Sequence, residues 1–196
     1  MLGGMISRPG PETALTLDPQ RRWLKGVRRV PSPNCDARPA PADIDLVVIH
    51  GISLPPDEYG GPHIDRLFTN TLDPAGHPYF GEICHLRVSA HVLIDRDGRL
   101  TQYVPFDQRA WHAGESCWAG REACNDFSIG IEFEGSDEAP YAAAQYRTGA
   151  RLLHAIRAAW PAITRDRVVG HSDVAPGRKT DPGPAFDWDR LFQPPD

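Results

Sequence analysis

The sequence lacks the features that mark several protein classes. Its longest apolar run is about four residues, at 46–49, far below the ~20 residues of a membrane-spanning helix. The N-terminal stretch MLGGMISRPGPETALTLDPQ has no basic start followed by an apolar segment, so it does not resemble a secretory signal. Lysine and arginine form no basic run, and the net charge is −5. The sequence therefore predicts no membrane span, and it gives no indication of nucleic-acid binding.

Cysteine is scarce and has no metal-binding or redox spacing. The four cysteines are Cys35, Cys84, Cys117 and Cys124, and no pair forms a CxxC motif. An even number permits disulfides, but the missing export signal favours free thiols in a cytoplasmic protein.

The composition that remains is typical of one globular domain. The chain has 196 residues, of which 40% are hydrophobic and 24% are charged; this length suits a single core, and we expect a monomer. Residues 1–20 are rich in glycine and proline and have no periodicity, so they are predicted to form a flexible extension before a domain at 21–196. Eight histidines are the most unusual feature of the composition.

Hydrophobic spacing predicts an α/β fold with a mixed central sheet flanked by helices. Residues 46–50 and 127–135 are predicted strands, and 167–171 a short one; in the second, Ile129, Ile131 and Phe133 share one face. Residues 85–105 are predicted to form a hairpin that turns at DRDG. Residues 142–160 show helical spacing and end at Pro161.

Two histidines and one aspartate are predicted to lie near the rim of this sheet. His50 and His171 each end a predicted strand, and Asp181 follows ten residues after His171. Two imidazoles and a carboxylate can hold Zn²⁺ with a fourth position open, as in catalytic zinc sites. The alternative is that each histidine is an ordinary buried polar residue and Asp181 a turn former, because eight histidines allow many chance triplets.

Three further charged residues belong to the same hypothesis. Glu132 and Glu134 lie on the polar face of the strand at 127–135, where they could simply be the solvated side of the sheet. If both faces of the sheet are covered, at least one of them is desolvated near a cleft and suited to accept a proton. Lys179, two residues before Asp181, is either a surface lysine or a group that stabilises an oxyanion.

Seven segments in order and spacing resemble one enzyme family. They are HGISLPPDEYGGP, HPYF, HLRVSAHVLIDRDG, QYVPFDQRAWHAG, CNDFSIGIEFEG, GHSDVAPGRKTDPGPAFDW and the short ARP. Over about residues 23–188 the chain is similar to the cytosolic AmpD-type 1,6-anhydro-N-acetylmuramyl-L-alanine amidases. These belong to the zinc amidases that include T7 lysozyme-like amidases and peptidoglycan recognition proteins, and the resemblance implies their fold.

The resemblance assigns roles to the charged residues. It implies that His50, His171 and Asp181 bind Zn²⁺. It also implies that Glu132, rather than Glu134, is the catalytic glutamate, and that Lys179 assists the transition state.

The resemblance also implies three substrate-binding positions. Tyr79 aligns with a tyrosine near the metal, whereas Arg87 and Trp111 match pocket positions. There a guanidinium can clamp a carboxylate and an indole can cover a sugar or peptide face. For Trp111 a core role remains an equal alternative.

Two positions depart from the family pattern. Gly51 stands where asparagine is common, and Ala123 stands where arginine is common, with Arg121 two positions earlier. These changes question one substrate hydrogen bond and the recognition of the stem peptide's carboxylates. They leave the predicted zinc and catalytic residues unchanged.

The implied function is zinc-dependent hydrolysis of the amide between (anhydro-)N-acetylmuramic acid and L-alanine. An anhydro-muropeptide would be the substrate, in cytoplasmic peptidoglycan recycling that is linked to β-lactamase regulation. Two alternatives are a non-catalytic peptidoglycan-binding module and an exported lytic amidase that acts on intact cell wall.

Overall fold

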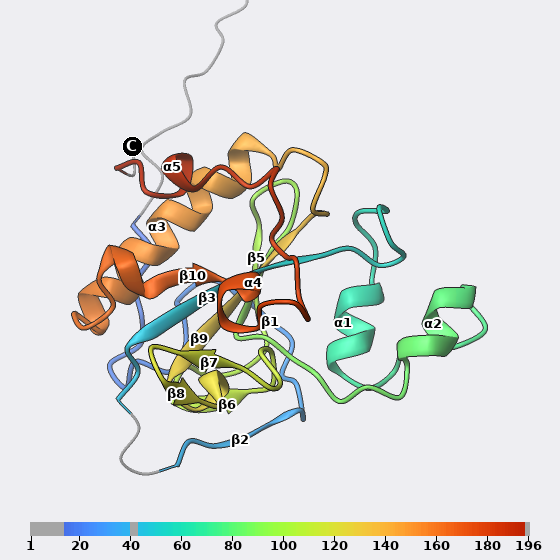
Figure 1. The fold of residues 1–196 in the computed structure, drawn as a ribbon, viewed down its shortest axis with the longest axis horizontal. Helices are drawn as coiled ribbons and strands as arrows, with labels where there is room; N and C mark the ends of the chain where they lie inside the picture. The colour runs from blue at the N-terminus through green and yellow to red at the C-terminus, as the bar shows by residue number, and fades with distance from the viewer. Residues whose placement is uncertain (1–13, 40–42, 195–196) are drawn as a thin grey trace, which may run out of the picture.

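A six-stranded mixed sheet forms the centre of the protein (Figure 1). The computed structural model describes residues 14–39 and 43–194. In spatial order the strands are β1 (Arg28–Arg29), β5 (Leu100–Gln102), β4 (Val92–Ile94), β9 (Ser128–Glu134), β3 (Leu46–Ile52) and β10 (Val168–Gly170). Strands β4, β9, β3 and β10 run parallel, and β5 is antiparallel to β4 and parallel to β1. The predicted mixed sheet and the predicted hairpin are confirmed.

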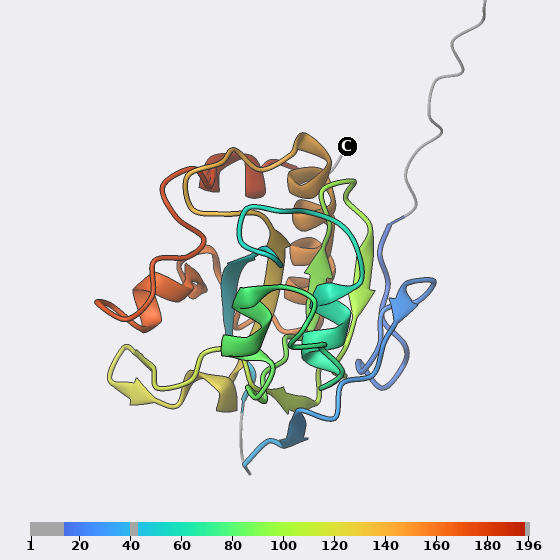
Figure 2. The ribbon, with the colours of Figure 1, turned by 90° about the vertical axis from the view of Figure 1, so that its right-hand side faces the viewer.

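Helices and two small strand pairs surround this sheet. The helices are α1 (His63–Phe68), α2 (Pro78–Ile83), α3 (Ala143–Ala159), α4 (His171–Val174) and α5 (Trp188–Leu191), with 3-10 turns at Cys124–Asp126 and Arg165–Arg167. The strand pairs are β2 (Cys35–Ala37) with β6 (Gln108–Ala110), and β7 (Cys117–Trp118) with β8 (Arg121–Glu122). In Figure 2, α1 and α2 stand in front of the strands and α3 lies behind them.

Strand β9 separates the two sides of the domain. Ile129, Ile131 and Phe133 belong to the core cluster that also contains residues of α3 and α5, as their alternation predicts. The other face carries Ser128, Gly130, Glu132 and Glu134, and every residue of β9 is buried. Both faces of the sheet are therefore covered, so the two glutamates are not its solvated side.

The long helix α3 forms close to the bounds that the sequence predicts. The Gln145 side chain accepts a hydrogen bond from the Ala142 N–H at 2.9 Å and donates to the carbonyls of Ile94 and Glu134 at 3.1 and 3.0 Å. These bonds satisfy an amide at the start of the helix and tie the helix to β4 and β9. Pro161 follows its end, where a proline cannot continue the helix.

The side opposite α3 contains a second cluster and a helix that sequence reasoning missed. Residues of α1, α2 and β4 pack there, together with the buried rings of Tyr103 and Phe68. Helix α2 has only six residues and includes Gly81, so it shows no helical periodicity. Helix α2 starts with Pro78 in its first turn. The His77 ring caps this end by accepting a hydrogen bond from the Tyr79 N–H at 3.1 Å.

The remaining sequence predictions concern the thiols, the membrane and the N-terminus. The four cysteines are free, as predicted. Within the described ranges, no helix combines the length and the apolarity needed to cross a membrane. Residues 1–13 of the predicted extension lie outside the described residues, but Leu17 forms an antiparallel bridge with Leu24, and Leu15 and Leu17 pack against the core. This later part of the predicted extension is thus held against the domain.

Replacing Ile131 with alanine is expected to lower the free energy of unfolding by about 2–5 kcal/mol, because the side chain is almost fully buried and a cavity would remain. Urea unfolding followed by circular dichroism measures the loss. Arg147→Ala, on the exposed side of α3, serves as the control and should change stability by less than about 0.5 kcal/mol. Equal effects of the two substitutions would contradict the assignment of the core.

Candidate active site

Three segments that are distant in the sequence meet at one edge of the sheet. His50 lies near the end of β3, in register with Glu132 on the neighbouring strand β9. Because in-register residues of adjacent strands share a face, both side chains point to the side opposite α3. His171 begins α4 directly after β10. Asp181 lies in the loop beyond α4. The backbone carbonyl of Asp181 accepts a hydrogen bond from the Ser172 N–H at 3.0 Å.

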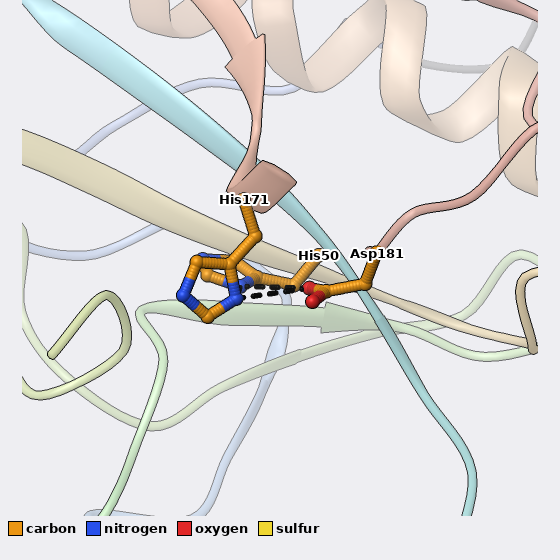
Figure 3. Close-up of side chains that lie close together, drawn as sticks. All are labelled: His50, His171 and Asp181. Atoms are coloured by element: carbon orange, nitrogen blue, oxygen red, sulfur yellow. Dashed lines mark hydrogen bonds and ion pairs between the residues drawn. The ribbon is translucent and has the colours of Figure 1, made fainter. Parts of the chain in front are cut away.

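The side chains of His50, His171 and Asp181 point toward one another (Figure 3). The two Nδ1 atoms lie 2.9 Å apart. The Oδ2 atom of Asp181 lies 3.3 Å from Nδ1 of His50 and 3.1 Å from Nδ1 of His171. Both histidines are buried, with 2% and 4% of their surface exposed. The structure therefore brings together the three residues that the sequence singles out as metal ligands.

This triangle has the dimensions and donor atoms of a metal site. A tetrahedral ion with bonds of about 2.0–2.1 Å keeps its ligand atoms about 3.3–3.4 Å apart, close to the three distances in the triangle. A set of two imidazole nitrogens and one carboxylate oxygen suits Zn²⁺ better than Mg²⁺ or Ca²⁺, because these two ions prefer oxygen ligands alone. The group can accordingly hold a metal ion.

The protonation of two of these groups fits the same conclusion. Burial lowers the pKa of His50 to about 4, although Asp181 acts to raise it. Burial acts to raise the pKa of Asp181, but the close contacts of its carboxylate with the His171 and His50 rings outweigh this and hold the pKa well below its usual range. Near neutral pH, His50 is neutral and Asp181 is ionised, which are the forms that bind metal.

Glu132 lies beside this group and has one carboxyl oxygen with no hydrogen-bond partner in the part of the chain that the structure describes. Its Oε2 atom is buried and unpaired among the described residues. Burial, and then the charge of Asp181, raise the pKa of Glu132 well above its usual value, whereas Lys179 acts to lower it. Perturbed carboxyl groups of this kind are typical of proton-transfer sites.

Glu134 differs from Glu132 although it lies on the same face of β9. Its carboxylate accepts hydrogen bonds from the N–H groups of Gly60 at 2.5 Å and Arg96 at 3.2 Å. Glu134 thus binds backbone N–H groups of two loops, and hydrogen bonding distinguishes the two glutamates that strand alternation could not tell apart.

An open cavity of about 720 Å³ gives access to these residues. Its walls and floor include His50, Glu132, His171, Lys179, Asp181, Tyr79 and Trp111. Ile83, Leu86 and Val88 add apolar side chains to the lining. The cavity therefore combines apolar surface with the polar groups that ligand sites usually have.

The three predicted substrate-binding residues have different surroundings. Tyr79 and Trp111 are half-buried and line the cavity; the Trp111 indole N–H also donates to Asp36 at 3.2 Å. The guanidinium of Arg87 instead donates to the backbone carbonyls of Cys84, His85 and Leu86, at the end of α2. The charge of Arg87 is thus directed at α2 and not into the cavity.

The two departures from the family pattern also lie in distinct places. At Gly51 a Cβ atom would overlap the hydroxyl of Tyr141, which donates to the carbonyl of Pro182 at 3.0 Å. Ala123 has a left-handed backbone with φ of 57° after the β7–β8 hairpin, outside the residues that line the cavity. Arg121 pairs with Asp45 at 2.7 Å, so in this conformation its charge does not replace the arginine common at position 123.

His112 is the site residue that sequence reasoning missed. It lies in the loop after β6, lines the cavity, and places Nδ1 2.9 Å from Nε2 of His50. A loop position has no periodicity that could indicate this contact. The only signal was its place within the quoted segment QYVPFDQRAWHAG.

Acidification is expected to destabilise the metal-free protein between about pH 6.5 and 4.5. Burial lowers the pKa of His50 to about 4 and that of His91 to about 3, and it lowers the pKa of His112 well below 6.5. The unfolded chain protonates all three below about pH 6.5, whereas the fold keeps them neutral. Glu132 acts in the opposite direction, because its raised pKa lets the folded state hold one proton.

Below about pH 6.5 the unfolded chain therefore binds more protons at these histidines than the folded one, and the raised pKa of Glu132 offsets part of this difference. Stability should fall by about 1.4 kcal/mol per pH unit for each net proton that is taken up on unfolding. Urea unfolding of chelator-treated protein at several pH values measures the slope. A flat profile would contradict the buried, neutral state of these histidines.

An α/β fold with two histidines, an aspartate and a buried glutamate at an open cavity is an arrangement typical of metal-dependent hydrolases. Comparison with known proteins makes this class specific. The sequence profile of the family described as N-acetylmuramoyl-L-alanine amidase matches residues 40–184. The chain belongs to this N-acetylmuramoyl-L-alanine amidase family.

Individual relatives agree with this membership. The 1,6-anhydro-N-acetylmuramyl-L-alanine amidase AmpD of Escherichia coli K12 is 60% identical over 172 residues, which are 88% of this chain and 93% of that protein. A crystal structure of a selenomethionine AmpD derivative superposes with a TM-score of 0.86 at 58% identity, covering 89% of this chain and 96% of that one.

AmpDh3 of Pseudomonas aeruginosa, in complex with anhydromuramic pentapeptide, has a TM-score of 0.60 at 30% identity. The superposition covers 78% of this chain and 61% of the AmpDh3 chain. The AmpD similarity confirms the predicted fold class.

Proposed function

We propose that this protein hydrolyses the amide bond between 1,6-anhydro-N-acetylmuramic acid and the L-alanine of the stem peptide. The observation that carries the proposal is the triangle of His50, His171 and Asp181 beside the unpaired carboxyl of Glu132. The named activity of the AmpD relatives at 55–60% identity supports the choice of bond.

In this proposal Nδ1 of His50, Nδ1 of His171 and a carboxylate oxygen of Asp181 hold one Zn²⁺. When bound, zinc supplies Lewis acidity that polarises a carbonyl group and lowers the pKa of water. The distances within the triangle and the mixture of nitrogen and oxygen donors support zinc.

In this proposal Glu132 transfers the proton of the attacking water. Its Oε2 atom has no competing hydrogen bond, so it is free to accept a proton from the attacking water. It can then return that proton to the nitrogen of the leaving L-alanine. Lys179 lines the same cavity, and its charge acts on Glu132; in this role it stabilises the oxyanion that develops from the scissile carbonyl.

The cavity walls bind the substrate in this proposal. The Trp111 indole and the Tyr79 ring cover apolar faces of the sugar or peptide. Arg87 would have to leave the carbonyls at the end of α2 to clamp a carboxylate. The ligand in the AmpDh3 complex, anhydromuramic pentapeptide, supports a muropeptide as the substrate class.

The cellular setting is proposed from the resemblance to AmpD-type amidases. The protein would act as a single amidase domain of residues 21–196, as a monomer, in cytoplasmic muropeptide recycling and thereby in β-lactamase regulation.

A metal-dependent assay on purified anhydro-muropeptide tests the function. Chelation should abolish release of the stem peptide, and added zinc should restore it, with the two products identified by mass spectrometry. Full activity after chelation would contradict the metal role. Stoichiometric zinc without any product would instead favour the non-catalytic binding module, and faster cleavage of intact sacculi would favour the lytic amidase.

A further inference from the structure

A chain of hydrogen bonds runs from His50 to a backbone carbonyl on the side away from Asp181. Nε2 of His50 lies 2.9 Å from Nδ1 of His112. Nε2 of His112 lies 3.2 Å from Oγ of Ser128, and that hydroxyl donates to the carbonyl of Cys124 at 2.6 Å. Ser128 is fully buried at the start of β9, so its partners belong to the protein.

The direction of every bond in this chain is determined by its last member. A carbonyl oxygen can only accept, so the single hydroxyl proton of Ser128 points to Cys124. Ser128 Oγ must then accept from Nε2–H of His112, which leaves Nδ1 of His112 as an acceptor. That acceptor takes the Nε2–H of His50, so the lone pair of His50 is on Nδ1, the atom that faces His171 and Asp181.

The fold provides a fitted place for the His112 ring. Gly130 lies between Ser128 and Glu132 on the same face of β9, and a Cβ atom at Gly130 would overlap the His112 ring. Only a residue without a side chain allows the imidazole to lie against the strand and reach both Ser128 and His50. The glycine at this position is thereby explained by packing.

Ala113, the residue after His112, determines the tautomer of His171 in the same way. The carbonyl of Ala113 accepts from Nε2–H of His171 at 3.2 Å, which in the neutral imidazole leaves the lone pair of His171 on Nδ1 as well. The N–H groups of His112 and Ala113 both donate to Oδ1 of Asn125, at 3.1 and 2.8 Å. Two consecutive residues held by Asn125 therefore orient both imidazoles.

We propose that His112 and Ser128 are positioning residues that hold His50 in the tautomer whose Nδ1 lone pair faces the metal site. The inference rests on the proposed metal site, since the tautomer matters only if His50 binds an ion. Without Ser128 Oγ as acceptor, the His112 ring can take the opposite tautomer and donate to Nε2 of His50. That exchange moves the His50 proton to Nδ1 and blocks the ligand atom.

Zinc affinity of the full-length, metal-free protein tests the proposal, by competition with a chromophoric chelator. His112→Leu and Ser128→Ala are each expected to raise the zinc Kd by about 10–100-fold. His112→Asn should recover most of the affinity, because its amide oxygen lies near the position of Nδ1. Ser116→Ala is the matched control. Ser116 is also buried, and its hydroxyl oxygen accepts a hydrogen bond from the Cys124 N–H at 3.1 Å. Loss of the Ser116 hydroxyl should leave the zinc Kd unchanged.

A second readout reports the tautomer itself. Long-range ¹H–¹⁵N correlation spectra of the metal-free protein should show His50 protonated at Nε2 in the wild type and a shift toward Nδ1 in Ser128→Ala. If His112→Leu fails to fold, Ser128→Ala and its spectrum decide the question.

Wild-type zinc affinity and an unchanged tautomer in folded variants would overturn the proposal. A rise in KM alone, with the zinc Kd unchanged, would also overturn it, because His112 would then act on substrate. A wild-type protein that binds no zinc would refute the metal site of the proposed function and this inference with it.

Discussion

Replacing Glu132 with glutamine is expected to lower kcat by about 10²–10⁴-fold, the usual contribution of a general base. The amide cannot accept and return the proton, but it has nearly the size of the carboxyl group. Zinc content and substrate affinity should remain, because Glu132 is not part of the ligand triangle. Steady-state kinetics on anhydro-muropeptide, combined with binding of substrate to the inactive variant, separates the two effects.

The neighbouring strand position provides the matched control. Glu134→Gln, two residues along the same face of β9, keeps an oxygen that can accept from Gly60 or Arg96, and Glu134 does not line the cavity. We expect kcat close to that of the wild type. Equal losses in both variants would mean that the strand, and not the Glu132 carboxyl, is responsible, and a fully active Glu132→Gln would refute the base assignment.

Replacing Asp181 with alanine is expected to remove the bound zinc and to lower kcat/KM by roughly 10³-fold or more, since the Lewis acidity of the ion supplies several kcal/mol of transition-state stabilisation. The substitution leaves two imidazoles, which are too few protein ligands for a catalytic zinc site. Elemental analysis after dialysis gives the zinc content, and the muropeptide assay gives the activity.

Asp189→Asn is the control for this experiment. Asp189 is an exposed aspartate that pairs with Arg165 at 3.0 Å. It does not line the cavity. Its zinc content and activity should equal those of the wild type. Retention of stoichiometric zinc by Asp181→Ala would contradict the ligand set.

Periodicity predicted the parts of the fold whose burial is regular. The alternation of Ile129, Ile131 and Phe133 gave β9, and helical spacing up to Trp160 gave α3 within about a residue at each end. Helix α2 was missed because six residues with a central glycine have no periodic face. The later part of the N-terminal extension was misjudged because one bridge from Leu17 to Leu24 leaves no pattern in the sequence.

The sequence predicted some residues of the candidate site and not others. His50 and His171 could be placed near each other because parallel strands end at the same edge of a sheet. The choice between Glu132 and Glu134 could not be made from alternation, since both lie on one face, and their different hydrogen-bond partners and positions relative to the cavity arise from tertiary contacts. His112 comes from a loop whose path is set by Asn125, and no local pattern encodes such a contact.

Diffraction data collected above and below the zinc absorption edge, from crystals grown with zinc, would locate the metal itself. We expect one anomalous peak within about 2.0–2.1 Å of Nδ1 of His50, Nδ1 of His171 and a carboxylate oxygen of Asp181. The absence of a peak there, or a peak that touches only one of these residues, would contradict this ligand set.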